Sequence, residues 1–311
     1  MVKKYLKNSP LNVSLAGLRL ANPTILASGI LGYSTETLES MVEGGAGAVV
    51  TKSVGLKPRN GYANPTIAQT SCGLINAMGL PNPGIDEFVK EICGAKAVLN
   101  VPLIVSVYGF SAEEYAKVSK KAVDSGADAI ELNVSCPHAK ETGSDIGQKP
   151  KILAEVVGKV KAAVDKPVFV KLSPNVTSIV EIAEATVKAG ADAITAANTV
   201  KAMAIDTETA IPILSNKIGG LSGPAIKPIA VRCVYEIYEQ VKVPILGCGG
   251  ITNWRDAVEF LLAGATAIQI GTAIALRGSS VFKAVARGIN AYLKKNDFRS
   301  VNEIVGLSHR S

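Results

Sequence analysis

The stretch Gly126-Ala-Asp-Ala-Ile-Glu-Leu-Asn-Val-Ser-Cys-Pro-His138 contains the pattern on which most of this chain is built. A glycine ends a helical pattern, an apolar run follows, and polar residues and a proline stop the run. The same Gly-Ala-Asp-Ala-Ile opening recurs at residues 190–194. Helices and strands are therefore expected to alternate along the chain, with each strand beginning soon after a helix ends.

Eight apolar runs of this kind follow one another, and amphipathic helical patterns separate most of them. The runs are residues 23–27, 46–51, 102–107, 129–134, 167–172, 191–197, 244–247 and 267–270. The clearest helical patterns are residues 111–125, 151–164, 178–189, 224–240, 254–263 and 281–295. This alternation predicts an α/β fold, a closed parallel (β/α)8 TIM barrel with its active site at the carboxyl ends of the strands. An open doubly wound sheet would need a dinucleotide fingerprint after the first run, which Ala27-Ser-Gly-Ile-Leu-Gly32 fits poorly.

Three segments lie outside this repeat. Residues 11–22 alternate around a glycine and predict an N-terminal β-hairpin. Residues 53–101 and 199–223 carry Gly, Pro and Asn with little periodicity. They predict long loops at the C-terminal face of the barrel, where such loops usually build the binding site. Because no linker divides the chain, we expect a single barrel domain over residues 1–311.

Composition narrows the class of protein further. The chain is 48% hydrophobic but only 5% aromatic, which suits helices packed on a parallel sheet. The first residues lack a signal-peptide pattern, and no run reaches the roughly 18 apolar residues that span a bilayer, so we expect a cytoplasmic protein without membrane contact. The lysines behind the net charge of +7 are dispersed, which favours a solvated surface over a nucleic-acid partner. The five cysteines include no C-x-x-C pair, so we expect no metal site and no disulfide framework.

Polar or glycine residues follow each apolar run, at the predicted functional face. Gly247-Cys-Gly-Gly250 and Gly271-Thr272 follow the last two runs, where backbone N–H groups of barrels commonly bind phosphate; tight turns are the alternative. Lys52 and Lys171 follow the second and fifth runs, and they either face an anionic ligand, such as a reduced flavin, or form ion pairs. Asn76, Asn133 and Asn198 offer amides that suit a planar ring with amide and carbonyl edges.

Cys136 lies where the fourth apolar run meets a loop. A lone cysteine is commonly an inert buried thiol, but its position beside Asn133 at a strand end favours a role in catalysis. His138 is separated from it by Pro137, which breaks the regular strand geometry that would bring the two side chains together. We therefore disfavour a Cys–His nucleophile pair.

Taken together, these motifs resemble class 1 dihydroorotate dehydrogenases, and within that class the B type. The resemblance runs from about residue 11 to about residue 300. It is carried by Ala27-Ser-Gly29, Thr51-Lys-Ser53, Asn76-Ala-Met-Gly-Leu80, Glu131-Leu-Asn-Val-Ser-Cys-Pro137, Lys171-Leu-Ser-Pro-Asn175, Ala197-Asn-Thr199, Gly219-Gly-Leu-Ser-Gly223, Gly247-Cys-Gly-Gly-Ile251 and Ile270-Gly-Thr272. Gly147-x-x-Pro150, after the cysteine, is typical of the B type.

The resemblance implies an FMN-binding barrel that oxidises dihydroorotate to orotate in pyrimidine (UMP) biosynthesis. It makes Cys136 the base and flavin N5 the hydride acceptor. It implies that FMN lies against Ser28, Lys52, Ser53, Ser106, Asn133, Lys171, Ala197, Gly223, Gly249, Gly250, Gly271 and Thr272. It implies that the substrate contacts Lys52, Asn76, Ala77, Met78, Gly79, Leu80, Asn133, Asn198 and Thr199. Two positions depart from the family, since Ser106 replaces a flavin-contacting asparagine and His138 replaces the asparagine usual after Cys-Pro.

The resemblance also implies partners. A homodimer core would bind an electron-transfer subunit with FAD and an iron–sulfur cluster, and this heterotetramer would reduce NAD. A fumarate-dependent A-type enzyme and a dihydropyrimidine dehydrogenase-type subunit are the nearer alternatives. A tRNA dihydrouridine synthase is disfavoured because little chain follows the eighth run, and a phospho-ligand-binding barrel without enzymatic activity would need neither thiol nor flavin.

Overall fold

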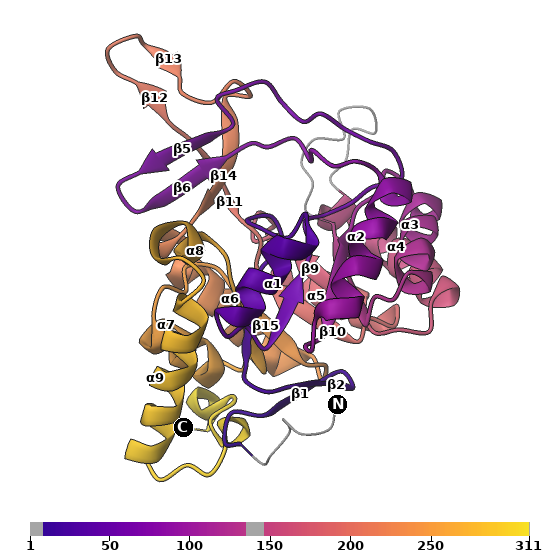
Figure 1. Cartoon of the computed structure of the whole chain (residues 1–311). Coiled ribbons are helices and arrows are strands. Elements are labelled where there is room, and N and C mark those ends of the chain that lie inside the picture. Colours follow the sequence, from indigo (N-terminus) through magenta and orange to yellow (C-terminus); the bar gives the residue numbers. More distant parts are fainter. Residues whose placement is uncertain (1–8, 135–145, 311) are drawn as a thin grey trace.

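Eight parallel strands close into a barrel in the computed structural model, which describes residues 9–134 and 146–310 (Figure 1). In chain order the barrel strands are β3 (Thr24–Leu26), β4 (Ala48–Val50), β7 (Leu103–Val107), β8 (Ala129–Asn133), β9 (Val168–Leu172), β10 (Ala193–Ala196), β15 (Ile245–Cys248) and β16 (Ala267–Ile270). Each neighbour pairs in parallel register, as Asn133 of β8 does with Lys171 of β9. Each strand overlaps one of the predicted apolar runs, so the predicted TIM barrel is confirmed.

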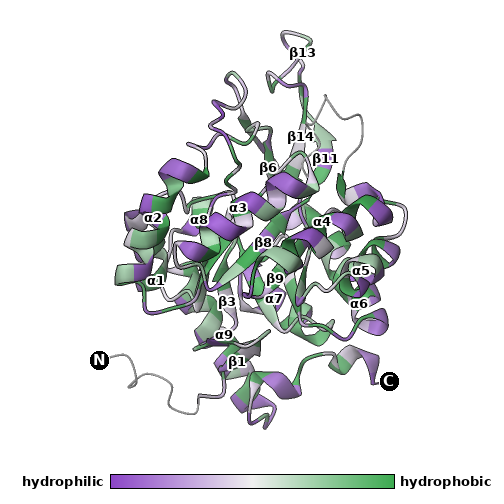
Figure 2. Ribbon diagram, turned by 90° about the vertical axis from the view of Figure 1, so that its right-hand side faces the viewer, coloured by the Kyte–Doolittle hydropathy of each residue, from purple (hydrophilic) through white to green (hydrophobic). Residues whose placement is uncertain are grey.

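Helices surround the barrel, and their apolar faces pack against it. They are α1 (Thr35–Glu43), α2 (Ile85–Val98), α3 (Ala112–Asp124), α4 (Pro150–Ala163), α5 (Ile179–Lys188), α6 (Lys227–Gln240), α7 (Trp254–Leu262), α8 (Thr272–Arg277) and α9 (Val281–Lys295). In α3 the buried residues Tyr115, Val118 and Ala122 recur at helical spacing, and the Ser111 hydroxyl caps the first turn. Figure 2 shows hydrophilic and apolar residues alternating around these helices, whereas strands β8 and β9 are largely apolar. Within the described ranges, no helix is both long and apolar enough to cross a membrane.

Short elements complete the chain around the barrel. The predicted N-terminal hairpin is confirmed as β1 (Val13–Leu15) paired antiparallel with β2 (Leu18–Leu20). It turns through Ala16 and Gly17, whose φ angles are 47° and 88°, the geometry that two-residue hairpin turns favour. Single 3-10 turns are η1 (Ile146–Gln148), η2 (Pro224–Ile226), η3 (Val301–Glu303) and η4 (Leu307–His309).

The two long connections contain regular structure that their weak periodicity did not predict, and this corrects the expectation of plain loops. Besides α2, they form a four-stranded antiparallel sheet in the order β11 (Val200–Met203), β14 (Ile218–Ser222), β6 (Gly73–Asn76) and β5 (Ile67–Thr70). A hairpin of β12 (Ile205–Asp206) and β13 (Ile211–Pro212) extends from it. Figure 1 shows this sheet projecting from the end of the barrel opposite to β1 and β2. We call the sheet and the hairpin together the arm.

Candidate active site

A cavity of about 380 Å³ opens at the carboxyl ends of the barrel strands. This volume falls within the range of small-molecule sites, roughly 300–1,000 Å³. Every barrel strand contributes to its lining, from Ser28 after β3 to Gly271 after β16. All the predicted cofactor residues line this one cavity: Ser28, Lys52, Ser53, Ser106, Asn133, Lys171, Ala197, Gly223, Gly249, Gly250, Gly271 and Thr272. The structure therefore brings this set together, while its role in binding FMN stays a prediction.

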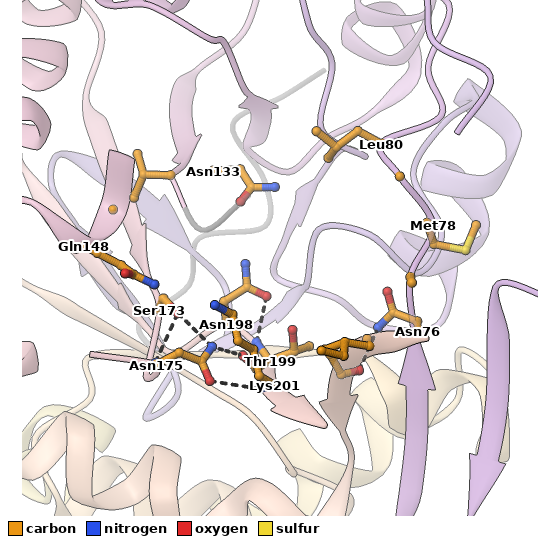
Figure 3. A pocket seen from close by; sticks show the side chains of 17 residues that line it. Asn76, Met78, Leu80, Asn133, Gln148, Ser173, Asn175, Asn198, Thr199 and Lys201 are labelled. Atoms are coloured by element: carbon orange, nitrogen blue, oxygen red, sulfur yellow. Dashed lines mark hydrogen bonds between the residues drawn. The ribbon is translucent and has the colours of Figure 1, made fainter. Parts of the chain in front are cut away.

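A smaller chamber of about 170 Å³, lined in part by residues of the arm, adjoins this cavity (Figure 3). The two spaces share Asn76, Met78, Leu80, Asn133, Asn198 and Thr199. Ala77 and Gly79 line only the chamber, and Lys52 lines only the larger cavity. All predicted substrate residues thus lie around two connected spaces. The chamber also takes in side chains to which the sequence pattern assigned no role, namely Gln148, Ser173, Asn175 and Lys201.

Ser53 is the centre of a hydrogen-bond cluster that joins four strand ends. Its hydroxyl lies 2.8 Å from the Ser106 hydroxyl and 3.4 Å from the Ser28 hydroxyl, and it accepts a 3.0 Å hydrogen bond from Nδ2 of Asn133. Ser106 is completely buried, and its hydroxyl positions that of Ser53.

Asn133 lines the shared space and has an unused acceptor. Its Oδ1 atom is buried and has no hydrogen-bond partner among the described residues. A buried acceptor without a partner costs free energy, roughly 1–3 kcal/mol, unless a ligand supplies the donor. The orientation of this carboxamide, set by Ser53, therefore suits a ligand that carries an N–H group.

The two predicted lysines have different surroundings. Lys171 is buried, donates a 2.8 Å hydrogen bond to Oε1 of Gln269 and lies 3.7 Å from Oε1 of Glu131. Burial lowers the pKa of Lys171, but Cys248 and Glu131 beside its ammonium more than offset this, and its pKa lies above the usual value. Lys171 is therefore both an ion-pair partner and a cavity residue.

Lys52 faces the cavity without such a partner. Its ammonium has no hydrogen bond or ion pair to another described residue, and burial lowers its pKa. A partly desolvated cation that has no counter-ion among the described residues can bind an anionic ligand group. This fits the ligand-facing alternative for Lys52 better than the ion-pair alternative.

A buried polar network inside the barrel was not predicted. Glu131 accepts hydrogen bonds from Thr195 Oγ1, at 2.9 Å, and from Gln269 Nε2, at 2.5 Å. Glu131, Thr195 and Gln269 are at most 1% exposed. One signal in the sequence could have indicated this network, namely the Glu131 carboxylate within an apolar strand. A buried charge almost always has a partner, so polar partners on other strands were to be expected.

The glycine turns after β15 and before η2 form a narrow backbone cradle. Gly249, Gly250 and Gly223 have φ angles of 126°, 79° and 94°, which favour glycine. A Cβ atom on Gly250 would lie 2.9 Å from the carbonyl oxygen of Gly223 and 2.7 Å from Cβ of Lys227. The N–H groups of Gly249 and Gly250 have no acceptor within the described part of the chain, so they are available to an anion such as phosphate.

The predicted base, Cys136, lies outside the described residues, as does His138. Cys248 is a different thiol, and it lines the larger cavity beside Lys171. Burial raises the pKa of Cys248. It is therefore poorly suited to remove a proton from a ligand.

Known proteins resemble this chain over almost its whole length. The family model described as dihydroorotate dehydrogenase matches residues 10–293. The protein named "Dihydroorotate dehydrogenase B (NAD(+)), catalytic subunit" from Pyrococcus abyssi is 54% identical over 298 residues, which cover 96% of this chain and 99% of that protein. Proteins of the same name from Methanothermobacter thermautotrophicus and Methanosarcina mazei are 52% and 46% identical over 302 and 304 residues. Those alignments cover 96% and 97% of this chain and 98% and 96% of the relatives.

Proposed function

The chain belongs to the dihydroorotate dehydrogenase family, and we propose that it is the catalytic subunit of a B-type enzyme. It oxidises dihydroorotate to orotate in pyrimidine biosynthesis, and the electrons pass to NAD through a partner subunit. One observation carries this proposal: a glycine cradle, two lysines and a chamber lined by carboxamides meet at the carboxyl end of one barrel. These three parts suit the phosphate of FMN, its flavin ring and a dihydropyrimidine with amide and carbonyl edges.

The residues of the larger cavity fit FMN. Gly249, Gly250 and Gly271 would hold the phosphate through backbone N–H groups, with Thr272 at the start of α8. The cluster around Ser53 and Asn133 offers hydroxyl and amide groups for the polar edge of the ring. Lys171 supplies a buried positive charge for a ring that becomes more negative on reduction. Bound FMN supplies the acceptor for the hydride.

The chamber suits the alternating donors and acceptors of dihydroorotate. Oδ1 of Asn198 accepts a 2.8 Å hydrogen bond from the backbone of Thr199, which leaves Nδ2 as a donor. Nδ2 of Asn76 donates to the carbonyl of Gly220 at 3.2 Å, which leaves Oδ1 as an acceptor. With Oδ1 of Asn133 as another acceptor, ring carbonyl and N–H groups both have complements. Lys52 would meet the substrate carboxylate.

Cys136 is proposed as the base, although it lies outside the described residues. In the sequence it lies three positions after Asn133, the last residue of β8. Its thiolate would take a proton from one ring carbon while the hydride leaves the neighbouring carbon. A thiol whose pKa is ordinarily about 8.5 suits such a proton transfer near neutral pH.

The arm supports a proposal about assembly. Met203, Ile205, Ile211 and Ile218 are large apolar side chains exposed on its strands. Apolar patches that water contacts in an isolated chain often mark protein interfaces. We propose that two chains associate through their arms, and that each binds an electron-transfer subunit carrying FAD and an iron–sulfur cluster, which gives a heterotetramer.

Cytoplasmic location and a single FMN domain over residues 1–311 belong to the same proposal.

The proposed function is tested by purifying the full chain with and without its electron-transfer partner. The expected result is a flavin absorbance spectrum that orotate perturbs, and NAD reduction by dihydroorotate only when the partner is present. Fumarate reduction by the lone chain would instead indicate an A-type enzyme. Spectral perturbation by uracil but not by orotate would indicate the dihydropyrimidine dehydrogenase type, and a colourless protein would contradict a flavoenzyme.

A further inference from the structure

Asn175 lies just beyond the end of β9 and makes hydrogen bonds to a distant segment. Its Nδ2 group donates to the carbonyl oxygen of Thr199 at 2.9 Å, and its Oδ1 atom accepts from the backbone N–H of Lys201 at 2.8 Å. Nδ2 and the backbone N–H of Asn175 also donate to the Ser173 hydroxyl, at 2.9 and 3.2 Å. Figure 3 shows the carboxamide between Ser173, Thr199 and Lys201 at the base of the chamber.

The two backbone groups that Asn175 contacts flank Val200 on one edge of β11. In a sheet, a further strand would bond to such a pair of C=O and N–H groups. β11 is an edge strand, since the order of its sheet is β11-β14-β6-β5. The Asn175 carboxamide therefore takes the place of a peptide group on this open edge, and it fixes the arm to the end of a barrel strand.

The groups that line the chamber extend from this contact across the sheet. Lys201 of β11 pairs with Gly220 of β14, and Gly220 pairs in turn with Asn76 of β6. Asn76 also donates through Nδ2 to the carbonyl of Gly220. On the other side, Thr199 holds the Asn198 carboxamide through its backbone N–H. The Asn175 side chain is thus connected, through the backbone of residues 199–201, to both Asn198 and Asn76.

We propose that Asn175 is a positioning residue that orients Asn198 and Asn76 toward the substrate by holding the edge of β11. Both hydrogens of its Nδ2 group have acceptors within the protein, and Oδ1 already accepts from Lys201. It therefore acts on a ligand through its neighbours. The identity of the ligand rests on the proposed function, whereas the contact with β11 does not.

The test compares Asn175→Ala with Asn296→Ala in the flavin-loaded full chain. Asn296 is a matched control, because its Nδ2 group also donates to a backbone carbonyl, that of Tyr292 at the end of α9. The first measurement is amide hydrogen exchange over residues 199–203 without ligand. The second is the orotate dissociation constant, from perturbation of the flavin spectrum, together with flavin content and thermal unfolding.

Asn175→Ala is expected to speed exchange in this segment and to raise the orotate dissociation constant by roughly threefold to tenfold, the range for losing one or two hydrogen bonds. KM for dihydroorotate should rise more than kcat falls, while flavin content stays unchanged.

Asn175→Asp keeps the acceptor for Lys201 but places an oxygen against the Thr199 carbonyl, so it should not restore affinity. Ser173→Ala removes the hydroxyl that accepts two hydrogen bonds from Asn175 and leaves the contacts of Asn175 with β11 in place, so it should give a smaller change of the same sign.

Unchanged exchange in Asn175→Ala would overturn the contact with β11 as a constraint. Faster exchange with wild-type orotate affinity would overturn the positioning role, and so would full affinity in Asn175→Asp. Should Asn175→Ala fail to fold, Asn175→Asp and Ser173→Ala decide by the same two measurements. If the wild-type protein does not bind orotate, the proposed function fails, and the exchange rates still decide whether Asn175 holds β11.

Discussion

The Glu131 carboxylate lies 3.7 Å from the Lys171 ammonium inside the barrel, where their side chains are 0% and 6% exposed. Lys171 reaches the flavin cavity, while Glu131 is held behind it by Thr195 and Gln269. Two opposite charges in such a site depend on each other, since neither is solvated by water. The carboxylate thereby allows a cation to be kept at the bottom of the cofactor cavity.

Glu131→Gln is expected to lower the free energy of unfolding by about 3–5 kcal/mol, because it leaves Lys171 as a buried cation without its counter-charge. Chemical denaturation followed by circular dichroism measures the change. Glu184→Gln is the control, since Glu184 pairs with Lys188 on the surface of α5, where their side chains are 40% and 77% exposed. It should not alter stability measurably. Equal losses in the two variants would contradict the role of burial.

Gly250→Ala is expected to weaken FMN binding by about tenfold or more, which corresponds to about 1.4 kcal/mol. The new methyl group would enter the cradle between Gly223 and Lys227. Gly278→Ala is a matched control, because Gly278 also has a positive φ, of 66°, but a Cβ atom there meets nothing within 4 Å. Flavin fluorescence titration of the apoprotein compares them. Similar FMN affinities for both variants would argue against a phosphate site at Gly250.

The barrel could be predicted because its signals are local. Strands buried on both faces produce continuous apolar runs, and glycines with positive φ, such as Gly126 and Gly190, mark where helices stop. The sheet of the arm lacks such signals, since its strands are short and partly exposed. Asn76 and Gly220 face each other across 144 residues of sequence, and no periodicity within either segment records that pairing.

The candidate site could be predicted in part for the same reason. Parallel strands of a closed barrel end at one face, so residues at their ends or just beyond, such as Asn133 and Ser53, must meet. Glu131 and Gln269 lie within strands, and their contact across the barrel depends on how the sheet closes. Asn175 bonds to β11, so its role could not be recognised before the sheet of the arm was known.

Ile211→Glu is expected to weaken association of the chain with itself by about tenfold or more. Ile211 is 59% exposed at the tip of the arm, and a charge there would be desolvated in an interface. Sedimentation velocity over a dilution series measures the change. Val98→Glu, at the end of α2 where Val98 is 51% exposed, should leave association unaltered. A dimer that persists in Ile211→Glu at the lowest concentration would exclude the tip of the arm from the interface.

Cys136→Ala is expected to retain bound FMN while the reduction of the flavin by dihydroorotate slows by roughly 10²–10⁴-fold, the usual contribution of a general base. Rapid-mixing absorbance of the flavin measures this step without the partner subunit. The exposed Cys93 on α2 provides the control, and Cys93→Ala should react like the wild-type protein. Near wild-type flavin reduction in Cys136→Ala would show that another group takes the proton.

Orotate binding is expected to weaken at alkaline pH because of Lys52. Burial lowers the pKa of Lys52 from its ordinary value of 10.5, so in the free protein its proton is lost below that pH. A bound carboxylate stabilises the protonated form and raises this pKa, so affinity is greatest below the lowered pKa and falls as pH rises through it. Lys171 does not account for this change, since its pKa is raised. Titration with orotate, followed by the flavin spectrum, should show this loss of affinity in the wild-type protein, whereas Lys52→Gln should bind orotate weakly at every pH. The same alkaline loss of affinity in Lys52→Gln would assign the loss to another group.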